Sequence, residues 1–192
     1  ASAETCVPFL EQGVKVVDLS ADFRLKSATA YQEWYDIPHP YPQYLEEVVY
    51  GLTELHRAEI CGASLVANPG CYATSALLAL APALQAGIVE PSFIVDGKSG
   101  VSGAGRSLKL GTHFSEVNES VSAYGIEGHF HLPEMVQELR ALDSQARVTF
   151  VPHLIPMTRG ILSTCYATVK EGALLPGTQG NRELTTIYHD FY

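Results

Sequence analysis

The chain has 192 residues, of which 46% are hydrophobic and 17% charged, a composition that excludes a disordered protein. Its net charge of −9 argues against a nucleic-acid groove or an anionic membrane surface as a partner, but not against small anionic substrates. The four cysteines lie far apart without a CxxC pair, so we expect neither a disulfide framework nor a zinc knuckle, and a reducing, cytoplasmic location is favoured.

The first 70 residues alternate between helix and strand patterns, which is typical of a doubly wound α/β sheet. Gly13 is expected to close the first helix in a left-handed conformation, and the proline-rich stretch 36–47 predicts a surface loop without regular structure. We expect helices at 2–12, 28–35 and 53–62, and strands at 14–19 and 64–67. Because an αβ unit stands at the very start, we also expect a fragment that lacks its N-terminal part.

In the rest of the chain fewer helices stand between the strands, which predicts an α+β domain with a mixed or antiparallel sheet covered on one side. Helices are predicted at 72–86, 133–142 and 180–191, and strands at 92–96, 121–126, 148–153 and 161–169. The apolar stretch 72–89 carries Pro82 and Gln85, so it predicts a packed helix and not a membrane span. We place the domains at 1–70 and 71–192, with the junction as a natural place for a cleft.

Cys71 lies at that junction, directly after a strand and the turn Asn68-Pro69-Gly70, and directly before the Ala- and Leu-rich helix. Unpaired N–H groups and the positive end of the helix dipole at such a position favour a thiolate over a thiol. The alternative is a buried structural cysteine. The turn-then-helix context favours a nucleophile.

A second candidate is the glycine-rich segment 97–106, which follows the strand at 92–96. It matches neither a P-loop, because the earlier glycine would fall at Ser92, nor a GxGxxG motif. A flexible surface loop is one interpretation. Arg106 at its end and Lys109 soon after favour a loop that contacts an anion.

A third candidate is the segment His129-Phe130-His131-Leu132-Pro133-Glu134. Pro133 suits the first turn of a helix and brings Glu134 within reach of the His131 ring, so the pair can act as a base and its orienting carboxylate. Two histidines at i and i+2 would share one face of a strand, and zinc is therefore a competing interpretation that lacks a clear third ligand. A structural histidine pair is another.

Polar groups at two further turns are weaker candidates. Ser20 and Arg24 lie in a turn at the carboxyl end of the strand 14–19, where open α/β sheets place ligand contacts. Arg159 lies between a proline-bounded turn and the strand 161–169 and could clamp a carboxylate or phosphate. A surface salt bridge explains Arg159 equally well.

Taken together, these motifs resemble the N-acetyl-γ-glutamyl-phosphate reductase family, which is related to aspartate-semialdehyde dehydrogenase. The likeness runs nearly end to end and in the family's order, through the segments 17–24, 50–52, 68–72, 99–106, 129–134 and 152–162. Leu132 and Ala73 depart from the usual residues without removing a reacting group. The glycine-rich GxxGYxG turn with which the family begins does not precede residue 1, and the usual C-terminal portion does not follow residue 192.

The resemblance implies a semialdehyde/glyceraldehyde-phosphate dehydrogenase-like fold: residues 1–70 the later part of the dinucleotide-binding domain, and 71–192 a catalytic domain incomplete at its C-terminus. It implies NADPH-dependent reduction of an acyl phosphate in arginine biosynthesis, with Cys71 acylated and His131, oriented by Glu134, as acid–base. The remaining implied site residues are, for NADP(H), Ser99, Gly100, Gly103, Ala104 and Gly105 and, for the substrate, Ser20, Arg24, Arg106 and Arg159. No metal is implied, and the expected assembly is a homo-oligomer, a dimer or tetramer.

Three alternatives remain open. The same cysteine, histidine and glutamate could serve a cysteine hydrolase or acyltransferase without a nicotinamide. A related reductase acts on a carrier-linked aminoadipyl phosphate, although a chain of net charge −9 offers little basic surface for an acidic carrier. The chain by itself could also be an inactive folding or interaction module.

Overall fold

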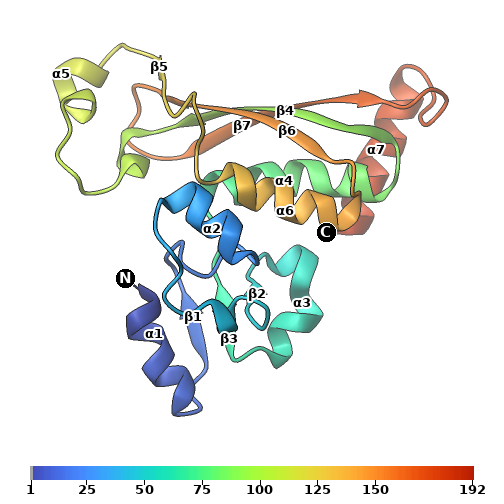
Figure 1. Cartoon of the computed structure of the whole chain (residues 1–192). Coiled ribbons are helices and arrows are strands. Elements are labelled where there is room, and N and C mark those ends of the chain that lie inside the picture. The colour runs from blue at the N-terminus through green and yellow to red at the C-terminus, as the bar shows by residue number, and fades with distance from the viewer. Residues whose placement is uncertain (1) are drawn as a thin grey trace. The chain divides into compact units, whose positions relative to one another are not determined.

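The computed structural model describes residues 2–192 and divides the chain into two compact units, the first ending at Thr74 and the second running from Ser75 to Tyr192. Figure 1 shows both units in chain colours. Within residues 2–192, no helix is both long enough and apolar enough to span a bilayer.

The first unit is built on a small parallel sheet of order β1-β3-β2, formed by β1 (Val16–Asp18), β2 (Val49–Tyr50) and β3 (Leu65–Ala67). Its helices are α1 (Ser2–Glu11), α2 (Ala28–Tyr35) and α3 (Thr53–Gly62). Helix α1 lies beside β1 and α3 beside β2 (Figure 1). The parallel α/β arrangement predicted for this half is confirmed.

The buried residues of this unit can be compared with the elements predicted from the sequence. Phe23, Leu45, Val48 and Leu65 are buried together with one face of α1. Gly13 has φ +78°, as expected for a left-handed helix end. The expectation of an irregular surface loop at 36–47 was wrong in part, because the 3₁₀ turn η1 (Pro42–Tyr44) carries Leu45 into the core.

The second unit contains a mixed four-stranded sheet of order β5-β6-β4-β7. Strand β4 (Val89–Ser99) runs parallel to β6 (Arg147–Leu154) and antiparallel to β7 (Ile161–Val169), and β5 (Ser122–Ala123) pairs antiparallel with β6. The helices α4 (Cys71–Gln85), α6 (Leu132–Leu142) and α7 (Thr178–Phe191) lie on one side of this sheet (Figure 1). The predicted mixed sheet covered on one side is therefore confirmed.

Alternation along β4 shows which face the helices cover. Phe93 and Val95 are at most 2% exposed, whereas Ile94 between them is 53% exposed. On β7, the hydroxyl of Ser163 lies 2.6 Å from that of Ser75 in α4, so the same face of β7 also points to the helices. The opposite face of the sheet is open to solvent.

Between β4 and β5 the chain makes an excursion for which the sequence predicted no regular element. It contains two 3₁₀ turns, η2 (Val101–Ala104) and η3 (Leu110–Thr112), and one helical turn, α5 (Phe114–Val117). Strand β5 has two residues and not the six expected at 121–126. The short segments lack the hydrophobic period that would mark them in the sequence.

Candidate active site

Exposure and helix position distinguish Cys71 from the other three cysteines. Burial raises the pKa of the Cys6 and Cys165 thiols, which keeps both protonated. Cys61 and Cys71 are exposed, but Cys61 lies at the C-terminal end of α3 while Cys71 is the first residue of α4. Cys71 is therefore the one exposed cysteine of residues 2–192 that stands at a helix N-terminus, the end at which a helix dipole favours an anion.

The turn before Cys71 is held by Arg24, a substrate candidate from the sequence. Arg24 is only 8% exposed; its Nε donates to the Asn68 carbonyl at 2.8 Å and its Nη2 to the Leu19 carbonyl at 3.1 Å. The Asn68 N–H donates in turn to the Asp18 carbonyl at 2.8 Å. The buried guanidinium thus joins the end of β1 to the turn that presents Cys71.

Ser20 takes part in the same local network. Its hydroxyl donates to Asp18 Oδ2 at 2.7 Å and its N–H to Asp18 Oδ1 at 2.9 Å. Asp18 Oδ1 also accepts from the Ser2 hydroxyl at 2.8 Å, and the Asp18 side chain is buried. The polar atoms of Ser20 therefore order the turn at the carboxyl end of β1.

In the second unit, His131 stands directly before α6 and Glu134 lies in its first turn, with Pro133 between them as predicted. The His131 ring is 6% exposed and Glu134 is fully buried. His131 Nε2 lies 4.0 Å from Glu134 Oε1, an ion-pair distance that exceeds a hydrogen bond. The buried Glu134 carboxylate is thus close enough to the His131 ring for an electrostatic interaction.

His129 is the residue that the sequence analysis left undecided. It lies in an irregular segment and not on a strand, so the strand face on which the zinc interpretation depends does not form. Its Nδ1 accepts the N–H of His131 at 3.1 Å, and the two ring centroids are 4.7 Å apart. Burial lowers the pKa of His129 to about 4, so the ring is neutral and carries its proton on Nε2.

Metal coordination finds little support in this arrangement. Because Nδ1 of His129 accepts the His131 N–H, the neutral ring carries its proton on Nε2. Nε2 therefore has no lone pair to offer a metal. Across residues 2–192, no group of three or more His, Cys, Asp or Glu side chains is arranged to hold a metal ion.

The glycine-rich segment is tied to the turn at 157–160. The N–H groups of Gly100, Val101 and Ser102 donate to the carbonyls of Gly160, Met157 and Thr158 at 2.9–3.0 Å. The Gly103 N–H donates to the Gly100 carbonyl at 3.1 Å, and the Ser99 hydroxyl to the same carbonyl at 2.9 Å. These backbone donors therefore hold the segment in place against the 157–160 turn.

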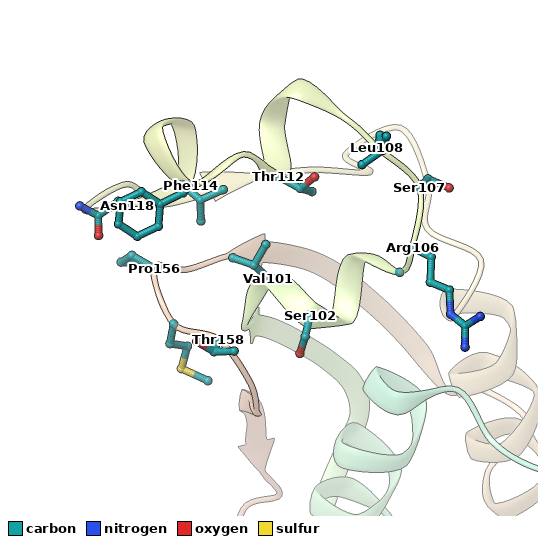
Figure 2. A pocket seen from close by; sticks show the side chains of 13 residues that line it. Val101, Ser102, Arg106, Ser107, Leu108, Thr112, Phe114, Asn118, Pro156 and Thr158 are labelled. Atoms are coloured by element: carbon teal, nitrogen blue, oxygen red, sulfur yellow. The ribbon is translucent and has the colours of Figure 1, made fainter.

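The same segment borders a pocket of about 500 Å³ that also involves the excursion and the 156–158 turn. Figure 2 shows Val101, Leu108 and Phe114 around an apolar space, and Ser102, Thr112 and Thr158 also line the pocket. The Arg106 side chain points away from Phe114 in this view. Arg106 is exposed, and its guanidinium can contact an anion.

The remaining candidates from the sequence, Ala104, Gly105 and Arg159, lie in the second unit. Ala104 and Gly105 end the glycine-rich segment, where Gly105 has φ +82°, and Arg159 is exposed beside it. The structure brings His131 and Glu134 together within the second unit and fixes Cys71 by groups of the first. The pairing of Cys71 with His131 stays a prediction.

Comparison with known proteins gives two family models in chain order. The model described as semialdehyde dehydrogenase, NAD binding domain, matches residues 1–63, and that described as semialdehyde dehydrogenase, dimerisation domain, matches residues 71–192.

Curated relatives are similar along almost the whole chain. An N-acetyl-gamma-glutamyl-phosphate reductase of Dehalococcoides mccartyi strain CBDB1 is 54% identical over 185 residues, which are 95% of this chain and 52% of the relative. One of Moorella thermoacetica is 50% identical over 184 residues, or 95% of this chain and 51% of the relative. The chain thus spans about half the length of the curated relatives it matches.

Solved structures support the fold. The crystal structure of aspartate semialdehyde dehydrogenase II from Vibrio cholerae superimposes with a TM-score of 0.66 at 19% identity, and the match covers 96% of this chain and 57% of that one. At this identity the likeness concerns the fold alone, and it agrees with the mixed sheet and helix arrangement described above.

Proposed function

This chain belongs to the semialdehyde dehydrogenase family, and from that premise we propose that it carries the reacting residues of an N-acetyl-γ-glutamyl-phosphate reductase. The observation that carries the proposal is the 54% identity to a reductase of that name over 95% of the chain. The reaction would reduce N-acetyl-γ-glutamyl phosphate to N-acetylglutamate semialdehyde and release phosphate, as a step of arginine biosynthesis. The cofactor would be NADPH, for which residues 1–70 would form part of the binding domain.

In the proposed mechanism the Cys71 thiolate attacks the acyl carbon. A C–S bond forms, the C–O bond to phosphate breaks, and phosphate leaves with that electron pair. The exposed position of Cys71 at the start of α4 supports this role, because the helix end stabilises the thiolate. Arg24 acts on this step through the turn that it holds, while exposed Arg106 and Arg159 are proposed to contact the anionic substrate.

A bound nicotinamide supplies the hydride that reduces the resulting thioester. The proton for the developing oxyanion would come from His131, with buried Glu134 stabilising the imidazolium. When His131 takes the proton back, the C–S bond breaks. The semialdehyde is then released, and the Cys71 thiolate is regenerated. Such acid–base help is worth about 10²–10⁴-fold, and His131→Asn should slow turnover within this range.

The chain is proposed to act as a homodimer in the cytoplasm. The family model matching residues 71–192 is described as a dimerisation domain, which supports the assembly. All four cysteines are free thiols, which supports a reducing compartment.

The test uses the complete gene product and follows NADPH formation at 340 nm from NADP⁺, phosphate and N-acetylglutamate semialdehyde. Cys71→Ser should abolish turnover, whereas Cys61→Ser, which replaces the other exposed cysteine, should leave it unchanged. One equivalent of iodoacetamide should label Cys71 before Cys61. Near-native turnover of Cys71→Ser would end the thioester mechanism, and acyl transfer without any nicotinamide would favour a cysteine acyltransferase.

A further inference from the structure

Helix α4 carries a row of small side chains on one face. Cys71, Ser75, Ala79 and Ala83 recur every four residues, and side chains at that spacing lie one above another along a helix. Ala79 and Ala83 border a cavity together with Phe93 of β4, so this face is directed to the sheet. Ser75 is therefore the residue one turn from Cys71 on the sheet-facing side of the helix.

The sheet offers little bulk opposite this end of α4. The side chains that β4 directs to the helices become smaller towards its carboxyl end, in the order Phe93, Val95, Gly97 and Ser99. Gly97 pairs with Ser163 of β7 in the antiparallel register, so neither strand places a large side chain at this point. Helix and sheet come close here, and Ser75 Oγ lies 2.6 Å from Ser163 Oγ, a contact here called the hydroxyl pair.

Two other hydroxyl groups bind α4 further along the helix. Tyr188 of α7 donates to the Ala79 carbonyl and Tyr192 donates to the Leu78 carbonyl. Pro82 has no N–H for the carbonyl four residues before it, so the Tyr192 hydroxyl replaces a donor that the helix itself lacks. These tyrosines complete the middle of the helix, whereas the hydroxyl pair lies in its first turns.

The strands beside the hydroxyl pair lead to candidate contacts for substrate and cofactor. Strand β7 begins at Ile161, two residues after Arg159, and β4 ends at Ser99, directly before Gly100. Ser163 therefore lies in the part of the sheet from which both candidate contacts extend. A bond from this part of β7 to the first turns of α4 sets where the helix start stands along the sheet.

We propose that Ser75 and Ser163 are positioning residues of the reductase, and that their hydroxyl pair holds the first turns of α4, and with them the Cys71 thiolate, against β7. This inference rests on the function proposed above and adds two residues that determine where the nucleophile stands. The hydroxyl pair acts on the substrate only through Cys71, so its loss lowers kcat and leaves KM. A displacement of about 1 Å is enough to cost about 10²-fold in rate.

The experiment measures the reductase kinetics of the complete gene product. Ser163→Ala should lower kcat at least about 10-fold, with KM for the semialdehyde within about two-fold of wild type. The matched control is Tyr188→Phe, which also removes one hydroxyl contact to α4, but at Ala79, two turns beyond Cys71. Both variants should lower the melting temperature by the same few degrees, while only Ser163→Ala slows turnover. Equal kinetics of the two variants would overturn the proposal.

Further variants separate positioning from a loss of folding. Ser163→Thr keeps a hydroxyl on the strand and should restore turnover, and Ser75→Ala reports on the same contact from the helix side. The double variant Ser75→Ala/Ser163→Ala should be no slower than the slower single variant, because both substitutions break one bond. Additive losses would contradict the shared role.

Alkylation distinguishes placement from ionisation of the nucleophile. In Ser163→Ala, iodoacetamide should react with Cys71 with the pH profile of wild type, because the helix end beside the thiol is unchanged. An altered profile that accounts for the whole loss in turnover would overturn the positioning role. Absence of reductase activity in wild type would refute the proposed function, whereas an active wild type that Ser163→Ala leaves unchanged would refute this inference alone.

Discussion

Replacing His129 by phenylalanine tests whether this ring holds the backbone of His131. His129 is 8% exposed, and its Nδ1 accepts the His131 N–H at 3.1 Å. Phenylalanine keeps an aromatic ring beside Phe150 and Tyr124 but leaves that buried N–H without its acceptor. An unsatisfied buried donor costs about 1–3 kcal/mol, so the melting temperature should fall by roughly 4–12 °C for a unit of this size.

The pH dependence of this loss provides the sharper test. Burial lowers the pKa of His129 to about 4, whereas an unfolded histidine has a pKa near 6.5. Below pH 6.5 the unfolded chain binds a proton that the folded chain refuses, so wild type loses stability as the pH falls from 6.5 towards 4. At pH 5 this loss is about 2 kcal/mol, and His129→Phe does not suffer it. The stability gap between the two proteins should therefore be widest at pH 7 and close near pH 5.

Urea unfolding at pH 7 and pH 5 measures both free energies, and His129→Asn is the matched control. Asparagine removes the titrating ring but offers Oδ1 as an acceptor in the place of Nδ1. Amide exchange should therefore be fast for the His131 N–H in His129→Phe and slow in His129→Asn. Equal stability of wild type and His129→Phe at pH 7, with parallel pH profiles, would refute the reasoning.

Two further substitutions test the segments around the candidate site. A Cβ at Gly100 would lie 2.7 Å from the backbone nitrogen of Arg159, so Gly100→Ala should lower stability by about 1–3 kcal/mol, while Gly111→Ala, which meets no atom within 4 Å, should not; thermal unfolding compares them. Arg24→Leu should cost about 2–3 kcal/mol, because the Asn68 carbonyl loses a charged donor, and urea unfolding in which Arg24→Leu matched wild type would contradict the role of Arg24 in the turn.

Local signals explain why much of the fold could be predicted from the sequence. The helix expected at 28–35 forms as predicted, because the Ser27 hydroxyl accepts from the Ala30 N–H at its start and Asp36 ends it with φ 58°. The strand and turn before Cys71 and the proline at the start of α6 carry equally local information. These features depend on residues within a few positions of each other.

What the sequence did not reveal depends on contacts between distant segments. Strand β2 has two residues and exists because Val49 and Tyr50 pair with β3, more than a dozen residues away. The N–H groups of the glycine-rich segment find their acceptors at 157–160, which no local pattern indicates. A phosphate loop and a packed loop have the same glycines, and only the destination of the hydrogen bonds separates them.

The candidate site shows the same limit in its histidines. Spacing alone left His129 as a zinc ligand or a structural residue, since both need a histidine near another. The hydrogen bond from the His131 N–H to Nδ1 decides for a positioning residue, because it fixes both the tautomer and the backbone that carries His131. A histidine three positions before the start of α6 was the available signal, and its meaning required the side-chain geometry.

Both candidate reacting groups are held by the same physical device. Arg24 is a buried side chain that satisfies the backbone carbonyl of Asn68, three residues before Cys71, and His129 is a buried side chain that satisfies the N–H of His131 itself. In each case a buried backbone group would lose its partner if the reacting residue moved, so displacement costs about 1–3 kcal/mol before any substrate is bound. The placement of the nucleophile and of the acid–base therefore depends on residues with no need to touch the substrate. Substitutions at Arg24 and His129 should reduce turnover by shifting their neighbours, with the chemistry of Cys71 and His131 left intact.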